Sequence, residues 1–340
     1  MQDDQREIRS LLREELEADF RSMGLPAYRA GQVFRWLHRG AGSFAEMSDL
    51  PKSLRDLLEE KYRLSAPAAM RRQESADGTV KTLWRLWDGN AVESVVMRYS
   101  YGNTVCISSQ VGCRQGCVFC ASTGLGFKRD LTAGEMLAEV LFSQLDSGLP
   151  ITGVVLMGIG EPLENYGQVL RFLRLVNHPQ GMNIGMRHIS LSTCGLVPEI
   201  RRLAEENLQL TLSVSLHAPD DETRRTIMPI ARKYDMESLI GCCTDYFRRT
   251  ERRISFEYAL IKGVNDASWQ AEKLAALMRR THGHLNLIPL NRVEGSPLIP
   301  GDAKSFADML KKLGVNVTVR RRLGADIDAA CGQLRRKEAT

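Results

Sequence analysis

Hydrophobic and polar positions divide the chain into a helical N-terminal part, a hairpin, and a long alternation of strands and helices. Between residues 3 and 62, apolar residues recur every three or four positions, as in LLREELEADF and PKSLRDLLEEKYRL. This period predicts a small helical module. The period changes in VKTLWRLWDGNAVESVVM, where apolar runs flank a DGN turn, and this pattern predicts a β-hairpin.

Beyond residue 99 the pattern predicts strands separated by amphipathic helices. Short β-rich runs that alternate with helices indicate parallel strands joined by right-handed crossovers. We therefore expect an α/β fold, with a full or partial (β/α) barrel favoured over a three-layer open sheet. Chemistry then belongs at the carboxyl ends of the strands. The predicted strands cover residues 105–109, 153–157, 188–192, 209–216, 254–260, 284–289 and 316–320.

Composition limits the class of protein without deciding its function. The 340 residues are 43% hydrophobic, which suffices for one large core and an appended module. No apolar run approaches the ~18 residues of a membrane span, and the polar N-terminus does not resemble a secretory signal. We therefore expect a cytoplasmic protein.

Basic residues are more informative than the net charge of +5. They cluster in pairs such as Arg224 and Arg225, and in two C-terminal groups at residues 320–322 and 335–337. Such clusters are typical of surfaces that bind a phosphate backbone, although a single pair is equally typical of a solvated helix end.

Three of the eight cysteines lie close together in CRQGCVFC, at Cys113, Cys117 and Cys120. Closely spaced thiolates bind zinc or an iron–sulfur cluster. A structural zinc site usually has four ligands, and a CxxC redox pair would leave Cys113 without a role. Three thiolates on a four-iron cluster leave one iron open to a further ligand, so the spacing favours the cluster over zinc.

Polar or glycine-rich motifs follow most of the predicted strands. GIGEP, STCG, SLHAP and NLIPLN each stand at a strand's carboxyl end. GIGEP is no dinucleotide fingerprint, because Leu163 occupies the place of the third glycine. A carboxylate among glycines, Glu161, suits an ammonium group, and a tight turn with an exposed glutamate is the alternative.

With these motifs together, the chain resembles the radical S-adenosylmethionine (SAM) superfamily. It resembles, almost end to end, the RlmN-type dual-specificity ribosomal RNA adenine methyltransferases, in segments such as NTVCISSQVGC, MGIGEPLENY, RHISLSTCGLVP and GADIDAACGQLR. The resemblance implies a partial (β/α) barrel of the radical SAM type with a small helical N-terminal domain and a short β extension. The expected parts are a helical RNA-contacting domain (1–66), a β-hairpin extension (67–98), the core barrel (99–326) and a C-terminal segment (327–340).

The resemblance also implies roles for individual residues. One [4Fe–4S] cluster with an open iron would be held by Cys113, Cys117 and Cys120. The implied catalytic residues are the proton acceptor Glu93, the methyl-carrying Cys331, and the resolving Cys106, which forms a transient disulfide with Cys331. Contacts to SAM are implied for Gly160, Glu161, Ser192, Ser215, Leu216, His217 and Asn291.

Ordinary structural interpretations stand beside these roles. Glu93 lies in an apolar strand and would then face solvent, His217 would be a core histidine, and Ser192 and Ser215 would be turn residues. Cys331 would be incidental without the motif around it.

The implied reaction is methylation of carbon 2 of adenosine 2503 in 23S rRNA and of adenosine 37 in tRNAs. It uses two SAM molecules per turnover and an external one-electron donor, such as a flavodoxin-like protein. We expect a monomer. Within the family, the alternative is Cfr-type methylation of carbon 8, which confers antibiotic resistance. Outside it, the alternative is a zinc-stabilised RNA-binding protein.

Overall fold

The computed structural model describes residues 5–124, 126–290, 297–328 and 334. Within these residues, a ten-stranded sheet has the order β14-β13-β12-β11-β10-β9-β6-β5-β4-β3. Its parallel strands are β6 (Gly102–Cys106), β9 (Ile151–Leu156), β10 (Ile189–Thr193), β11 (Thr211–Ser215), β12 (Ser255–Leu260), β13 (His284–Pro289) and β14 (Val317–Val319). Each predicted strand overlaps one of these, so the predicted α/β fold is confirmed.

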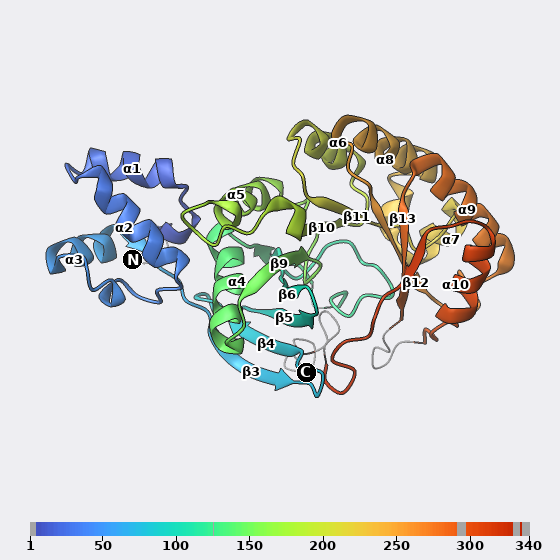
Figure 1. The fold of residues 1–340 in the computed structure, drawn as a ribbon, viewed down its shortest axis with the longest axis horizontal. Helices are drawn as coiled ribbons and strands as arrows, with labels where there is room; N and C mark the ends of the chain where they lie inside the picture. The colour runs from blue at the N-terminus through green and yellow to red at the C-terminus, as the bar shows by residue number, and fades with distance from the viewer. Residues whose placement is uncertain (1–4, 125, 291–296, 329–333, 335–340) are drawn as a thin grey trace.

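Helices cover the outer face of this sheet, and the sheet curls into an incomplete barrel (Figure 1). The helices are α4 (Ala133–Ser147), α5 (Tyr166–Asn177), α6 (Val197–Glu205), α7 (Asp221–Ile227), α8 (Met236–Thr250), α9 (Ser268–Thr281) and α10 (Ala303–Lys312). The two edges of the sheet, β14 and β3, do not pair with each other. This confirms the partial barrel.

The loop after β6 contains the three-cysteine motif. It is framed by a short antiparallel pair, β7 (Gln110–Val111) with β8 (Arg129–Asp130). Helix α4 starts directly after β8 in a capping box, since Thr132 and Glu135 each accept a hydrogen bond from the other's backbone amide. The loop therefore leaves the sheet and returns to it at fixed points.

A β extension continues the sheet on one side through antiparallel pairs. It consists of β3 (Ala68–Glu74), β4 (Val80–Arg85) and β5 (Ala91–Tyr99). The predicted hairpin is β4 with β5. Strand β3 was not predicted, because most of its residues are polar or exposed and show no apolar alternation.

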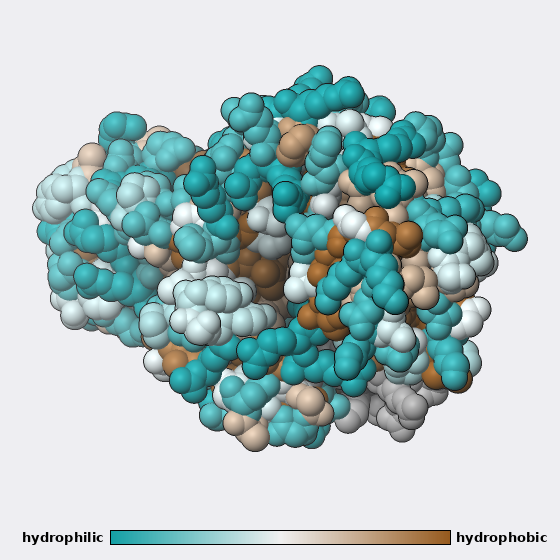
Figure 2. Space-filling view, turned by 45° about the vertical axis from the view of Figure 1, so that its right-hand side comes forward, coloured by the Kyte–Doolittle hydropathy of each residue, from teal (hydrophilic) through white to brown (hydrophobic). Residues whose placement is uncertain are grey.

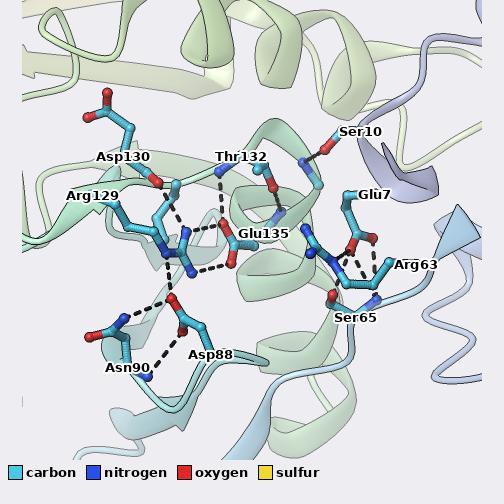
Figure 3. A network of polar contacts seen from close by, with 12 residues as sticks. Glu7, Ser10, Arg63, Ser65, Asp88, Asn90, Arg129, Asp130, Thr132 and Glu135 are labelled. Atoms are coloured by element: carbon cyan, nitrogen blue, oxygen red, sulfur yellow. Dashed lines mark hydrogen bonds and ion pairs between the residues drawn. The ribbon is translucent and has the colours of Figure 1, made fainter. Parts of the chain in front are cut away.

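The N-terminal residues form a helical module that docks against the start of α4. It contains α1 (Arg13–Ser22), α2 (Ala27–His38), α3 (Lys52–Lys61) and the paired short strands β1 (Arg6–Glu7) and β2 (Tyr62–Arg63). Figure 3 shows the junction, where Ser10 accepts a hydrogen bond from the amide of Gly134 and Arg129 bridges Asp88 and Glu135. The predicted domain boundaries stay predictions.

The surface seen in Figure 2 is mostly hydrophilic, and hydrophobic residues show in a recess near the centre of this face. Among the described residues, no helix is both long and apolar enough to cross a membrane.

Candidate functional site

A cavity of about 560 Å3 lies at the carboxyl ends of the parallel strands. Its wall is built from the cysteine loop and from the turns that follow β9, β10 and β11, so residues far apart in the sequence meet there. The predicted site residues that line it are Cys113, Cys117, Cys120, Gly160, Glu161, Ser192, Ser215 and His217.

The cysteine loop has a compact fold that only glycine permits at one position. Gly112 has a φ of +88°, and a Cβ there would lie 1.6 Å from the carbonyl oxygen of Gly126. Within the loop, the amide of Cys120 donates to the carbonyl of Cys117 at 3.1 Å. These contacts hold the motif in one turn beside the cavity.

The chemistry of the cysteines fits an iron–sulfur cluster. Burial raises the pKa of Cys113 and of Cys117 to about 12, and the charges of Cys120 and Glu161 act in the same direction. Three adjacent thiolates are therefore stable here only against a strongly cationic partner, as the iron of a cluster is. Among the described residues, no three His, Cys, Asp or Glu side chains form a ready-made site for a single metal ion. The fit thus rests on burial, donor type and the shared cavity.

Glu161 is held with its carboxylate in a fixed orientation. Gly160 has a φ of +111°, and a Cβ there would lie 2.7 Å from the side chain of Gln110, whose Oε1 accepts from the amide of Glu161. The carboxylate accepts from the amides of Leu163 at 3.1 Å and Cys194 at 2.7 Å. Burial raises the pKa of Glu161, and these donors oppose the rise. The alternative of an exposed turn glutamate is wrong, and the remaining lone pairs suit an ammonium group.

His217 is neutral and rigidly held at the end of β11. Its Nδ1 accepts from the amide of Ala259 at 2.8 Å, and its backbone carbonyl accepts from Asn265 at 2.7 Å. Burial lowers the pKa of His217 to about 3, and the charge of Arg224 lowers it further. The ring proton therefore lies on Nε2. His217 thus has the hydrogen bonds of a core histidine and also lines the cavity.

Three further predicted SAM contacts, Ser192, Ser215 and Leu216, lie at the ends of β10 and β11. Ser192 is in β10 opposite Ser213, and Ser215 ends β11; both line the cavity. Leu216 is fully buried, and its amide donates to the carbonyl of Glu257 at 3.0 Å. The carbonyl of Leu216 accepts from the amide of Ala218 at 2.8 Å, and Leu216 is not among the residues that line the cavity, so its role in binding SAM stays a prediction.

Arg224 was missed as a site residue and was wrongly grouped with a basic surface pair. It is fully buried, and its guanidinium donates to the carbonyls of Cys194 (2.7 Å), Ser215 (3.2 Å) and Leu216 (3.2 Å). It therefore holds the ends of two strands beside the cavity. The only sequence signal is its place four residues after the helix cap Asp220, which is too weak to separate it from Arg225.

Glu93 and Cys106 lie on the inner face of the sheet. In β5, Val95, Met97 and Glu93 alternate onto one face, and Val95 and Met97 line the cavity. Cys106 pairs with Val95 across the strands and packs in the same cluster. Glu93 is buried and forms an ion pair with Lys81 at 2.8 Å, so the interpretation that it faces solvent is wrong.

Asn291 and Cys331 lie outside the described residues. Cys106 is buried, and the part of the chain that the structure describes contains no disulfide between cysteines. A pairing of Cys106 with Cys331 stays a prediction.

The fold and the site define a radical SAM enzyme. Residues 107–275 match the model of the radical SAM superfamily, and residues 7–64 match that of the ribosomal RNA large subunit methyltransferase N-terminal domain. A crystal structure of a radical SAM methyltransferase from Sphaerobacter thermophilus has a TM-score of 0.92 and 43% identity, covering 96% of this chain and 98% of that one.

Curated relatives narrow the class. A probable dual-specificity RNA methyltransferase RlmN from Clostridium acetobutylicum is 51% identical over 317 residues, 92% of each chain. Its counterpart from Desulforamulus reducens is 48% identical over 97% of this chain and 96% of its own length. The chain belongs to the RlmN family of radical SAM RNA methyltransferases. The superfamily uses a [4Fe–4S] cluster and SAM, and the alternative of a non-catalytic zinc-stabilised protein is wrong.

Proposed function

We propose that this enzyme methylates carbon 2 of adenosine 2503 in 23S rRNA and carbon 2 of adenosine 37 in tRNAs, through an S-methylcysteine on Cys331. The observation that carries the proposal is a buried carboxylate, Glu93, and a buried thiol, Cys106, on the inner face beside the cavity. A simple methyl transfer from a sulfonium to a nucleophile needs neither group, whereas removing a ring proton and resolving a covalent adduct needs both.

The cofactor roles follow from the cavity. Cys113, Cys117 and Cys120 would hold the cluster and leave one iron open. Glu161 would accept from the ammonium group of SAM, and the remaining contacts are assigned to Gly160, Ser192, Ser215, Leu216, His217 and Asn291. When bound, SAM supplies a methyl group and, after one-electron reduction by an external flavodoxin-like donor, a second molecule supplies a 5′-deoxyadenosyl radical.

The protein's own residues perform the remaining steps. Cys331 accepts the methyl group on sulfur. Transfer of one hydrogen atom from this methyl group to the 5′-deoxyadenosyl radical that SAM would supply leaves a carbon radical, which adds to the adenine ring and ties the RNA to the protein. The ring adduct then gives up one electron, for which the oxidised cluster would be the acceptor. The carboxylate of Glu93 takes the ring proton. The thiolate of Cys106 then attacks the sulfur of Cys331, so a disulfide forms as the carbon–sulfur bond breaks and the methylated base leaves.

The expected partners are folded RNAs. Structured RNA is recognised through phosphates, 2′-hydroxyls and splayed bases, and the target base must leave its stack to reach a buried cavity. The exposed Arg321 and Arg322 line the cavity and suit phosphate contacts. We propose that the enzyme acts as a monomer in the cytoplasm.

Mass spectrometry of nucleosides tests the proposal. The chain is expressed in a strain that lacks its own carbon-2 methyltransferase, and rRNA and tRNA are digested separately. We expect 2-methyladenosine from both. Formation of 8-methyladenosine alone would show Cfr-type activity and refute the carbon-2 assignment, and methylation of rRNA alone would refute dual specificity.

A further inference from the structure

Lys81 is a fully buried lysine on the inner face of β4. Its Nζ lies 2.8 Å from Oε2 of Glu93, and the two residues are diagonal neighbours, since Lys81 pairs with Val95 and Leu83 pairs with Glu93. Burying two charges is expensive, and a well-packed apolar pair of the same volume is often as stable or more stable. A stability role alone therefore gives little reason for this pair.

Lys81 also contacts the C-terminal segment. Its Nζ donates to the backbone carbonyl of Asp328 at 2.6 Å. Gln73 of β3 contacts the same residue twice, because it donates to Oδ2 and accepts from the amide, both at 3.1 Å. Asp328 precedes Cys331 by three residues. One lysine thus contacts both the carboxylate of Glu93 and the segment that leads to Cys331.

The turn between β3 and β4 holds the preceding residues of this segment. Ser75 donates to the carboxylate of Asp326, and the amide of Ala76 donates to the same carboxylate at 3.0 Å. The amide of Gly324 donates to Asp77 at 2.8 Å. We call residues 324–328 the strap. The turn between β3 and β4 therefore binds the strap at Gly324 and Asp326. Lys81 of β4 adds the contact that lies next to Glu93.

The charged and titratable groups around Glu93 come from every element packed against β5. They are Lys81 on β4, Cys106 on β6 and Glu139 on α4. On the strap, Asp328 contacts Lys81 through its backbone carbonyl and Gln73 through its carboxylate. Burial raises the pKa of Glu139 well above its usual value, which favours the neutral form of its carboxyl group. Lys81 is the cation in this set, and it opposes the acidic groups.

We propose that Lys81 is a positioning residue that holds the carboxylate of Glu93 and the strap in a fixed arrangement next to each other. The inference rests on the proposed function, since it assigns Lys81 a part in proton removal from the adenine ring. The ion pair holds in place the carboxylate that takes the ring proton once the methylene carbon on the sulfur of Cys331 has bonded to the ring. The contact of Lys81 with Asp328 fixes the strap relative to this carboxylate.

The test is the pH dependence of a single methyl-transfer turnover. Wild type and the variants Lys81→Met, Lys81→Gln, Lys81→Arg and Gln73→Leu are prepared anaerobically with cluster, and each is premethylated on Cys331. Loss of the cation disfavours the ionised carboxylate, so the acid limb of the rate profile in Lys81→Met and Lys81→Gln should move to higher pH by about one to three units. Lys81→Arg keeps the charge and should keep the wild-type limb.

Gln73→Leu is the matched control, because it removes two contacts to the strap without changing any charge. Its rate should fall without movement of the limb. Lys81→Gln keeps a hydrogen-bond donor and carries the test if Lys81→Met does not fold. Superimposable profiles of wild type and the neutral variants, or an arginine variant that behaves like them, would overturn the inference and leave the proposed function intact. A wild type that makes no 2-methyladenosine would overturn both.

Discussion

Replacing Arg224 by methionine would remove three hydrogen bonds from the strand ends that surround the cavity. The guanidinium is fully buried and contacts the carbonyls of Cys194, Ser215 and Leu216. Methionine fills a similar volume but donates nothing. The carbonyl of Leu216 keeps the amide of Ala218 as a donor at 2.8 Å, whereas those of Cys194 and Ser215 lose the guanidinium. The substitution therefore tests whether this arginine holds the site together.

The expected decrease in the free energy of unfolding follows from the number of carbonyls that lose a hydrogen-bond donor. A buried acceptor left without its donor costs about 1–3 kcal/mol, which gives a gross loss of about 2–6 kcal/mol for the two carbonyls of Cys194 and Ser215. The substitution also removes a buried cation. Burial of this cation is unfavourable in the wild type and lowers the pKa of Arg224, so its removal offsets part of the loss in stability. We expect a net destabilisation of about 3 kcal/mol. At about 3 kcal/mol per molar urea, the unfolding midpoint falls by about 1 M.

Arg225 provides the internal control for this measurement. Its side chain is 51% exposed and its carboxylate partner Asp221 lies 4.0 Å away, so Arg225→Met should change stability by no more than about 0.5 kcal/mol. Urea unfolding is followed by tryptophan fluorescence under anaerobic conditions, with matched cluster content. Equal midpoints for Arg224→Met and wild type would refute the reasoning, as would equal losses in the two arginine variants.

Two further predictions concern catalysis and acid stability. Cys331→Ala should abolish RNA methylation, while Cys106→Ala should accumulate a covalent protein–RNA adduct visible on denaturing gels, and normal turnover by the Cys106 variant would remove its resolving role. Burial lowers the pKa of His38 to about 3; the unfolded chain therefore binds the extra proton below about pH 6.5, and stability falls as pH drops from there toward 3. Replacing His38 by leucine should recover about 3 kcal/mol of this loss by pH 4.5 in a urea series, and identical pH slopes would contradict the assignment.

The parallel strands and the cysteine motif were predictable because their signals are local. Apolar runs between helices mark β9 to β13, and a strand's carboxyl end is where the next motif must lie. Cys113, Cys117 and Glu161 therefore meet in the cavity as expected.

The supporting residues were not predictable, since their partners lie far away in the sequence. A lysine within VKTLW would ordinarily face solvent, but Lys81 is buried on the inner face, where it contacts Glu93 and, 247 residues further along the chain, Asp328. The sequence does not distinguish Arg224 from its neighbour Arg225. Only the folded chain brings the carbonyls of Cys194 and Ser215, at the ends of β10 and β11, next to Arg224. Strand β3 has no apolar alternation because much of its surface is exposed.

The strap also has a consequence for how the enzyme is made. Gln73 and Asp328 are 255 residues apart in the chain, so β3 and β4 leave the ribosome long before the strap that they bind. Domains fold largely in the order of synthesis, so the contact of Lys81 with Asp328 forms only when translation is nearly complete. A chain that stops just after β14 would retain every strand of the barrel sheet. It would lack the contacts between the strap and strands β3 and β4. Full-length synthesis is thus a condition for a finished site, which separates a folded truncation product from an active enzyme.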